Sequence, residues 1–328
     1  MARAEVTRGG RYAVGVDLGG TKLATALVSE EGRVLHSLVV PTRAEEGVAA
    51  VLERMAEGVE RVLSAGGVRR EEVAGVGIGA PGSLDRAAGR VIFSPNLGWK
   101  DVPLREALSR KLGGAAVVLE NDANAAAWGE YRFGAGRGTR NFIYVTISTG
   151  IGGGIIVEGR LYRGAGGAAG EVGHMTILAG GPRCSCGSDG CWEALASGTA
   201  IARRAREALA LGEESALGEL QRRGELVTAA QVARAAQRGD RLAQRILAET
   251  WFFVGVGLAN LANLFDPERI ALGGGVAQVG EPLLARAREL VRLRALAGPA
   301  REVEVTLAAL GGEAGVIGAA ALAFQEGG

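Results

Sequence analysis

The chain has 328 residues, of which 48% are hydrophobic, and its 37 basic and 36 acidic side chains leave a formal net charge of +1. This length and composition indicate a globular protein with one or two sizeable cores. The balanced charge gives no electrostatic footprint for nucleic acid or an anionic membrane, and no apolar run approaches the roughly 20 residues that span a bilayer. We therefore expect a cytoplasmic protein with neither nucleic acid nor a membrane as partner.

The first part of the chain predicts five strands and two helices. Alternating or continuous apolar residues, bounded by turns, indicate strands over residues 12–16, 23–28, 34–40, 73–80 and 115–120. Helical periodicity indicates helices over about 44–63 and 103–112.

The pattern of strands joined by a glycine-rich turn begins again near residue 141. A second hairpin is expected over about 141–164, and helices follow, including an unusually apolar one over about 241–264. A strand, a helix, a further strand and a final helix reach about residue 324. The restart predicts an internal duplication, with two similar halves.

Glycine occurs 54 times, about twice the number that an average usage of roughly 7% would give. Many glycines stand where apolar strands end, and backbone N–H groups of such turns can reach phosphate oxygens. Asp17 ends the first strand directly before such a turn, and a carboxylate there can hold Mg²⁺ through water. Two such turns suit a nucleotide, although either one alone also fits an ordinary hairpin, and neither has the lysine spacing of a P-loop.

All three cysteines and one of the two histidines lie within eighteen residues, in the order His174, Cys184, Cys186 and Cys191. Three thiolates and an imidazole form a complete tetrahedral shell for structural Zn²⁺. The alternative, buried unpaired thiols, does not explain why every cysteine of the chain falls in this cluster. A nucleic-acid-binding zinc module would need basic residues around the ligands, and the cluster has few. The sequence therefore predicts a structural zinc loop.

Asn121 and Asp122 end a predicted strand and begin a predicted helix. One interpretation of Asp122 is a helix N-cap, which accepts backbone N–H groups. The other is a general base, because ligands of open α/β sheets gather at the carboxyl ends of strands, where a carboxylate can accept a hydroxyl proton. Asn121 has both donor and acceptor atoms for a neighbouring hydroxyl.

Together these pieces resemble the ROK family of repressors, open reading frames and kinases, from about residue 11 to 324, and within it the glucokinases. The resemblance is carried by DLGGTK at 17–22, GAPG at 79–82, SPNLGW at 94–99, END at 120–122, STGIGGG at 148–154, GEVGH at 170–174, CSCGSDGCWEALASG at 184–198 and LGGGV at 272–276.

The resemblance implies an α/β, two-domain actin-like ATPase (ribonuclease H-like) fold with a cleft between the domains and a structural zinc loop. The small domain would comprise residues 1–120 plus about 312–328, and the large domain residues 121–311. ATP, Mg²⁺ and structural Zn²⁺ would be the cofactors. A homodimer or higher homo-oligomer is also implied.

The resemblance assigns roles to individual residues, with Asp122 as the general base. Sugar hydroxyls would be bound by Asn96, Asn121, Asp122, Glu171, His174 and Glu193. The nucleotide would be bound by Asp17, Gly19, Gly20, Thr21, Lys22, Thr149, Gly150, Gly273, Gly274 and Gly275. With zinc on one ring nitrogen of His174, the other could donate to the sugar.

The implied function is ATP-dependent phosphorylation of a hexose, with glucose to glucose 6-phosphate favoured. Fructokinase-like members often carry an extra histidine in the zinc loop, which this sequence lacks. Mannose, N-acetylmannosamine, fructose or another hexose stays open as the substrate, and so does a non-catalytic sugar-sensing role. The approximately ten residues before the first strand are too few for the DNA-binding domain of the repressor members.

Overall fold

The computed structural model describes residues 10–326, which form two compact units. Of the described residues, unit 1 contains 10–139, 154–170 and 309–326, and unit 2 contains 140–153 and 171–308. These divisions fall at other positions than the domain boundaries expected at 120/121 and 311/312. The expected boundaries stay a prediction.

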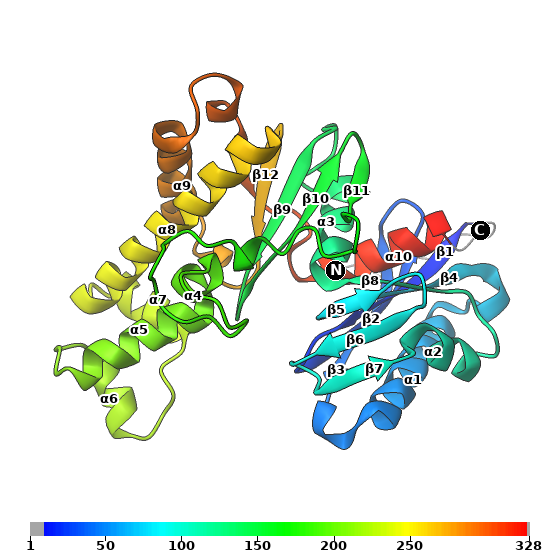
Figure 1. Cartoon of the computed structure of the whole chain (residues 1–328). Coiled ribbons are helices and arrows are strands. Elements are labelled where there is room, and N and C mark those ends of the chain that lie inside the picture. Colours follow the sequence, from blue (N-terminus) through cyan, green and yellow to red (C-terminus); the bar gives the residue numbers. More distant parts are fainter. Residues whose placement is uncertain (1–9, 327–328) are drawn as a thin grey trace. The chain divides into compact units, whose positions relative to one another are not determined.

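Unit 1 is built on a five-stranded sheet in the order β3-β2-β1-β4-β8 (Figure 1). The β1-β2-β3 part is antiparallel, whereas β1, β4 and β8 run parallel. The strands are β1 (Tyr12–Leu18), β2 (Lys22–Ser29), β3 (Val34–Pro41), β4 (Val73–Ala80) and β8 (Val117–Asn121).

Three helices cover this sheet: α1 (Val48–Gly66) packs on β2 and β3, while α3 (Asp122–Phe133) and α10 (Ala314–Glu326) pack together, with α10 on β1 and β4 (Figure 1). Glycines in the strands permit the close approach of α10. A Cβ on Gly15 or Gly77 would lie 1.8 Å from a backbone oxygen of this helix. The helix expected from about residue 44 begins at Val48 instead, because Gly47 has φ +89° and ends a short 3₁₀ turn over Ala44–Glu46.

A second, three-stranded sheet of unit 1 was not anticipated from the sequence. It has the order β5-β6-β7, formed by β5 (Ser83–Asp85), β6 (Arg90–Ser94) and β7 (Trp99–Val102), and α2 (Leu104–Lys111) follows it. The sheet places the SPNLGW segment in the turn between β6 and β7.

The second five-stranded sheet has the order β11-β10-β9-β12-β13, and the division between the units passes through β10. Its strands are β9 (Phe142–Ile147), β10 (Ile151–Val157), β11 (Arg160–Tyr162), β12 (Arg269–Gly273) and β13 (Glu304–Leu307). The helices of unit 2 are α4 (Trp192–Ala196), α5 (Gly198–Ala210), α6 (Leu217–Arg222), α7 (Ala229–Gln237), α8 (Arg241–Phe265) and α9 (Glu281–Arg294).

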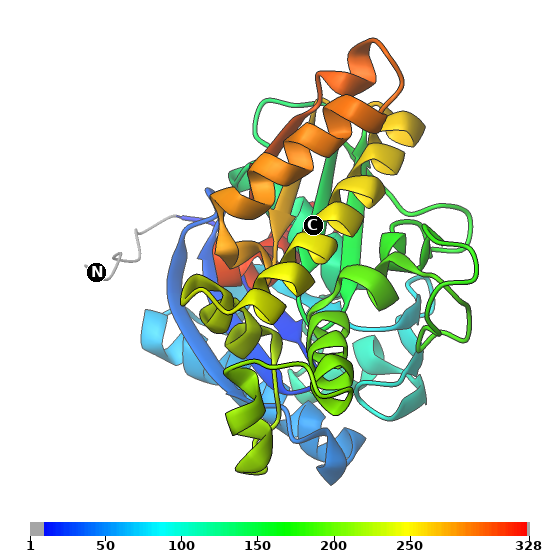
Figure 2. The ribbon, with the colours of Figure 1, turned by 90° about the vertical axis from the view of Figure 1, so that its left-hand side faces the viewer.

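The long helix α8 lies alongside α9 in unit 2 (Figure 2). Among the described residues it is the one helix long and apolar enough to be a candidate membrane span, but 61% of the apolar window is buried inside the protein. Such burial is what the central helix of a packed core requires, so the apolar composition of α8 has a structural explanation.

The two large sheets repeat one connectivity, because β1-β2-β3 followed by β4 and β8 corresponds to β9-β10-β11 followed by β12 and β13. The predicted duplication is therefore confirmed. A strand order of this kind, occurring twice with helices on the sheets, is the actin-like, ribonuclease H-like arrangement, and the expected fold class is confirmed.

Candidate active site and metal centre

In unit 1, three candidate segments lie at the carboxyl ends of neighbouring parallel strands. The strand register pairs Asp17 of β1 with Gly79 of β4, and Gly79 with Glu120 of β8. Since adjacent strands are about 4.8 Å apart, the end of β1 and the end of β8 are separated by about 10 Å. Asp17, the GAPG segment and the Asn121–Asp122 pair therefore share one edge of the sheet, which is where such sheets bind ligands.

The first glycine turn is held by one hydrogen bond within its own hairpin and by two hydrogen bonds from Thr42, outside this hairpin. The N–H of Gly19 donates to the carbonyl of Lys22 at 2.9 Å, and the hydroxyl of Thr42 donates to the carbonyl of Gly19 at 2.6 Å. Thr42 is fully buried, and its N–H also donates to the carbonyl of Thr21 at 3.0 Å. Sequence reasoning missed this brace, because nothing in the sequence places residue 42 beside residue 19.

Gly20 brings the first glycine turn against the β6–β7 turn. A Cβ at Gly20 would lie 3.0 Å from the backbone oxygen of Asn96 and 3.1 Å from its Cβ. Asn96 itself is exposed. The structure thus places the expected sugar-side residue Asn96 directly beside the expected phosphate turn.

The negative charge of Asp122 contributes to the raised pKa of Asp17. The pKa of Asp17 is raised to about 6, mainly by burial and then by the charge of Asp122, and the positive charge of Lys22 opposes this rise. Burial also raises the pKa of Asp122, partly offset by the N–H of Ala123. Two carboxyl groups in one poorly solvated site are a fitting environment for a divalent cation, whose charge would offset their mutual repulsion.

Asn121, rather than Asp122, is the N-cap of α3. Its Oδ1 accepts the N–H groups of Ala123 at 3.0 Å and Asn124 at 3.1 Å. The first interpretation of Asp122, as the helix cap, is therefore wrong. The carboxyl of Asp122 accepts the adjacent N–H of Ala123 at 2.8 Å and its own main-chain N–H. The Asn121 cap leaves its Nδ2 as a donor on the same edge of the sheet.

A buried ion cluster lies next to these two residues and was also missed from the sequence. Glu120 is 1% exposed, and its carboxylate pairs with Arg86 at 3.0 Å and with Arg163 at 2.7 Å. Both arginines also contact Glu326 near the end of α10. Because breaking a buried ion pair leaves an uncompensated charge, this cluster stabilises the position of Glu120 near the end of β8.

In unit 2, the second glycine turn lies between β9 and β10 and packs on the start of α5. The N–H of Gly198 donates to the carbonyl of Ser148 at 2.7 Å, and the hydroxyl of Thr199 donates to the carbonyl of Thr149 at 2.8 Å. Thr149 is exposed. The turn thus presents Thr149 and Gly150 at the carboxyl end of β9.

Glu193 of α4 reaches the same turn. Its carboxylate accepts the N–H of Ile151 at 2.9 Å, and a Cβ on Gly150 would lie 2.3 Å from its Oε2. Glycine at position 150 is therefore needed for this contact. Glu193, an expected sugar ligand, thus contacts the second glycine turn, which is expected to bind phosphate, within unit 2.

The Gly273–Gly275 segment follows β12 at the same edge of the unit 2 sheet. Gly273 pairs with Thr146 near the end of β9, and Gly274 has φ +84° with a virtual Cβ only 2.4 Å from the carbonyl oxygen of Ile147. A side chain at position 274 would be both strained and obstructed. The segment therefore lies beside the second glycine turn.

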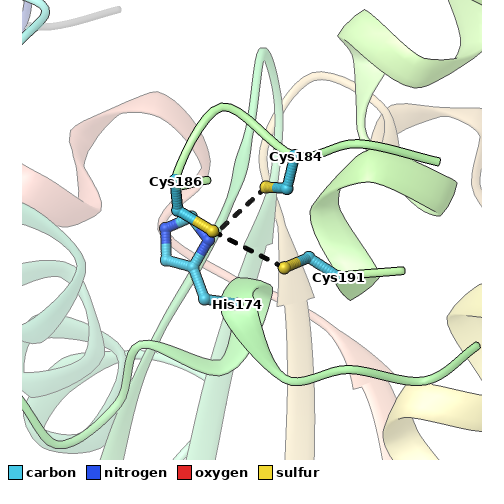
Figure 3. A group of neighbouring side chains, drawn as sticks. All are labelled: His174, Cys184, Cys186 and Cys191. Atoms are coloured by element: carbon cyan, nitrogen blue, oxygen red, sulfur yellow. Dashed lines mark hydrogen bonds between the residues drawn. The ribbon is translucent and has the colours of Figure 1, made fainter. Parts of the chain in front are cut away.

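The zinc-ligand candidates gather in one cluster, although their sequence positions span eighteen residues. Figure 3 shows the three sulfur atoms and the imidazole of His174 around a common point, with all four donor atoms within 4.8 Å of one another. The Sγ atoms of Cys186 and Cys191 are 3.6 Å apart, and Sγ of Cys184 is 3.8 Å from Nδ1 of His174. A tetrahedral ion with Zn–S bonds of about 2.3 Å has S···S edges of about 3.8 Å, so the donor set fits zinc.

The pKa values of two thiols in this cluster are shifted in opposite directions. Burial, followed by the neighbouring thiols, raises the pKa of Cys191, whereas the N–H of Ser188 and other contacts lower the pKa of Cys186. A cation at the common point would favour all three as thiolates, which is the ligand form that zinc requires. Since Nδ1 of His174 faces the sulfur atoms, its Nε2 is the nitrogen left for another partner, and the His174 side chain is exposed.

Glu171 lies directly before the 3₁₀ turn Val172–His174. A metal ion bound by His174 would therefore restrict the position of Glu171, three residues earlier. The carbonyl of Glu171 accepts the N–H of His174 at 3.1 Å. Gly173 in this turn lies against β10, where a Cβ would be 2.0 Å from the carbonyl oxygen of Ile151. The zinc loop and the second glycine turn are thus packed together within unit 2.

Duplicated sheets, two glycine turns at strand ends and a histidine–tricysteine cluster define an actin-like ATPase of the sugar-kinase type with a zinc loop. The sequence matches the ROK family over residues 13–326, and the chain belongs to this family.

Among its relatives, a glucokinase of Streptomyces coelicolor is 42% identical over 326 residues, covering 95% of this chain and 97% of the relative. Among solved structures, a ROK family glucokinase from Streptomyces griseus in complex with glucose and AMPPNP is 40% identical, with a TM-score of 0.83 over 96% of this chain and 99% of the other. A ROK hexokinase from Thermus thermophilus is also 40% identical, with a TM-score of 0.80 over 96% and 98% of the two chains.

Proposed function

We propose that this protein is a glucokinase, which transfers the γ-phosphate of ATP to the 6-hydroxyl of glucose, with Asp122 as the general base. The observation that carries the proposal is the placement of Asp122. It lies at the carboxyl end of β8 beside Asn121, in the same row of strand ends as Asp17. Because Asn121 caps α3, the carboxyl of Asp122 is not needed to begin the helix.

The raised pKa of Asp122 suits the role of a base. A carboxyl group that is poorly solvated holds a proton more strongly than one in water, so it is a better acceptor for a hydroxyl proton during attack on phosphorus. Phosphoryl transfer needs an aligned oxygen, neutralised charge and a destination for that proton. Asp122 supplies the last of these.

Each unit contains residues that we propose as sugar ligands. Asn121 can donate through Nδ2, and Asn96 is exposed beside Gly20. In unit 2 the proposed ligands are Glu171, Nε2 of His174 and Glu193. Glu193 accepts the N–H of Ile151 through Oε2 at 2.9 Å and the hydroxyl of Ser185 through Oε1 at 3.4 Å, and we propose the more weakly bound Oε1 for a sugar hydroxyl.

The nucleotide would be held by the two glycine turns and by the Gly273–Gly275 segment. Residues 20, 21, 149 and 150 have short side chains or none, so their backbone N–H groups suit phosphate oxygens, and Lys22 adds a positive charge. Asp17 would hold the Mg²⁺ of Mg-ATP through water, and the ion would neutralise charge on the phosphates. Zinc would act only on structure, by fixing the loop that carries Glu171 and Glu193.

The test is a coupled assay of ADP release with Mg-ATP and a panel of hexoses. The proposal expects turnover with glucose at a higher kcat/KM than with mannose, N-acetylmannosamine or fructose. A higher kcat/KM for another hexose would change the substrate and leave the kinase mechanism standing. Glucose binding in calorimetry without any ADP release would instead favour a sugar-sensing protein. A homodimer and a cytoplasmic location also remain predictions of family membership.

A further inference from the structure

Thr42, directly after β3, is a fully buried residue with hydrogen bonds on all of its polar groups. Its hydroxyl donates to the carbonyl of Gly19 at 2.6 Å, and its N–H donates to the carbonyl of Thr21 at 3.0 Å. Its own carbonyl accepts a hydrogen bond from Nη1 of Arg54, on α1, at 2.9 Å. Thr42 therefore links α1 to the first glycine turn, and all of these residues belong to unit 1.

The hydroxyl of Thr42 sets the orientation of the peptide group between Gly19 and Gly20. In a planar trans peptide the C=O and the N–H point in opposite directions. Because the carbonyl oxygen of Gly19 faces Thr42, the N–H of Gly20 is directed away from Thr42. Within residues 10–326 this N–H donates no hydrogen bond. Gly20 is also partly exposed, so its N–H is a donor that a ligand can use.

This orientation has to be imposed, because a peptide group between two glycines has little preference of its own. Glycine reaches φ values of either sign at low cost, so such a peptide group can rotate. In the rotated orientation the carbonyl oxygen of Gly19 would face a phosphate and repel it. Thr42 opposes the rotation, because its buried hydroxyl would lose its hydrogen-bond acceptor.

The position of Thr42 is maintained from α1 and from the turn before it. Arg54 binds the carbonyl of Thr42 and also forms an ion pair with Glu46, in the 3₁₀ turn Ala44–Glu46. The Arg54 side chain is mostly buried. The donor at Gly20 is therefore oriented before any ligand arrives, and a preorganised donor binds without the cost of ordering it.

We propose that Thr42 is a positioning residue of the nucleotide site, which directs the N–H of Gly20 at a phosphate group of the nucleotide. This inference deepens the proposed function and rests on it for the identity of the ligand. Since Thr42 is fully buried, it acts through the glycine turn and not by contact with the ligand. Its effect should fall on ligands that carry phosphate and not on glucose.

Thr42→Val is the informative substitution, because it keeps the shape of the side chain and removes the hydroxyl. The affinity for Mg-AMPPNP in calorimetry, with and without glucose, should fall on the order of 10-fold, as for loss of one hydrogen bond to a charged group. KM for ATP should rise by a similar factor while kcat stays within about 3-fold. Glucose affinity should stay within about 2-fold of the wild type, because the sugar carries no phosphate.

Rescue and a matched control separate positioning from general stability. Thr42→Ser keeps the hydroxyl and should restore the affinity for Mg-AMPPNP to within about 3-fold of the wild type. In the control, Ser109→Ala, the lost hydroxyl donates to the carbonyl of Ala115 at 2.8 Å, before the amino end of β8 and thus at the opposite edge of the same sheet. Ser109→Ala should lower the melting temperature and leave the affinity for Mg-AMPPNP unchanged.

Three results would overturn the role of Thr42. They are wild-type affinity for Mg-AMPPNP in Thr42→Val, a loss in Thr42→Ser as large as in Thr42→Val, and an equal loss in Ser109→Ala.

Hydrogen exchange in the wild-type protein tests the inference even if Thr42→Val fails to fold. The Gly20 amide should exchange rapidly in the free protein and be protected at saturating Mg-AMPPNP. Exchange of this amide that is unchanged by Mg-AMPPNP would refute the inference. A wild type that binds Mg-AMPPNP with this protection, yet releases no ADP from ATP with any hexose, would count against the proposed function alone.

Discussion

Replacing Asp17 by asparagine should stabilise the free protein, although it removes a residue proposed for magnesium binding. Burial and the charge of Asp122 raise the pKa of Asp17 from 3.8 to about 6. Below pH 3.8 this carboxyl is protonated in both the folded and unfolded chain and does not affect stability. Between pH 3.8 and about 6 the unfolded chain has lost the proton that the folded chain keeps, so the free energy of unfolding decreases as pH rises.

The magnitude follows from the size of the shift. A shift of about two pKa units corresponds to about 3 kcal/mol. Because the Asp17 side chain is partly open to solvent, we expect its charge to lower the free energy of unfolding by about 2 kcal/mol. For a chain of this size that is a difference of about 3 °C in melting temperature. The Asp17→Asn variant should therefore melt higher than the wild type at pH 8 and at nearly the same temperature at pH 4.

The assay is thermal unfolding across this pH range in buffer without magnesium or nucleotide, since a bound cation would offset the repulsion. Asp101→Asn serves as the control, because Asp101 is an exposed aspartate of unit 1 and its ion pair with Arg90 lies at the surface, where such pairs contribute little to stability. Its φ of +54° is a conformation that asparagine also tolerates. The control should follow the wild type at every pH. A melting difference for Asp17→Asn that is the same at pH 4 and pH 8 would show that the burial argument is wrong.

Two further predictions concern metal and packing. The protein should contain about one equivalent of zinc per chain, and Cys191→Ser should lower both the zinc content and the melting temperature; active protein without metal would contradict the zinc assignment. Gly318→Ala should destabilise unit 1 by about 3 kcal/mol or more, because the new Cβ would meet the carbonyl oxygen of Ala125, whereas Gly312→Ala, with open space around it, should be nearly neutral. Equal denaturant midpoints for the two glycine variants would show that α3 and α10 separate easily.

Apolar periodicity was sufficient to predict the strands of both large sheets, because most of them are apolar runs bounded by turns. It could not predict β5, β6 and β7, since these short strands have exposed apolar residues such as Ile92 and Phe93 at 49% and 53%. It also misplaced the beginning of α1, where a single positive-φ glycine interrupts an otherwise helical pattern.

The zinc cluster was predictable because its chemistry lies in residue types at short spacing. The roles of Thr42 and Glu120 were not, since each depends on partners distant in the sequence. Thr42 binds main-chain groups of residues 19 and 21, and no pattern along the chain relates these positions. Likewise, the sequence could not decide between Asn121 and Asp122 as the N-cap, because both residue types favour that position.

The most direct test of the account is the turnover of Asp122→Asn with glucose and Mg-ATP. The substitution keeps the size of the side chain and removes the proton acceptor, while the Asn121 cap keeps α3 intact. We predict a loss of kcat on the order of 10²-fold or more, with glucose affinity in calorimetry changed far less, and near wild-type turnover for Asp101→Asn. An Asp122→Asn variant that turned over at close to the wild-type rate would contradict the assignment of Asp122 as the general base.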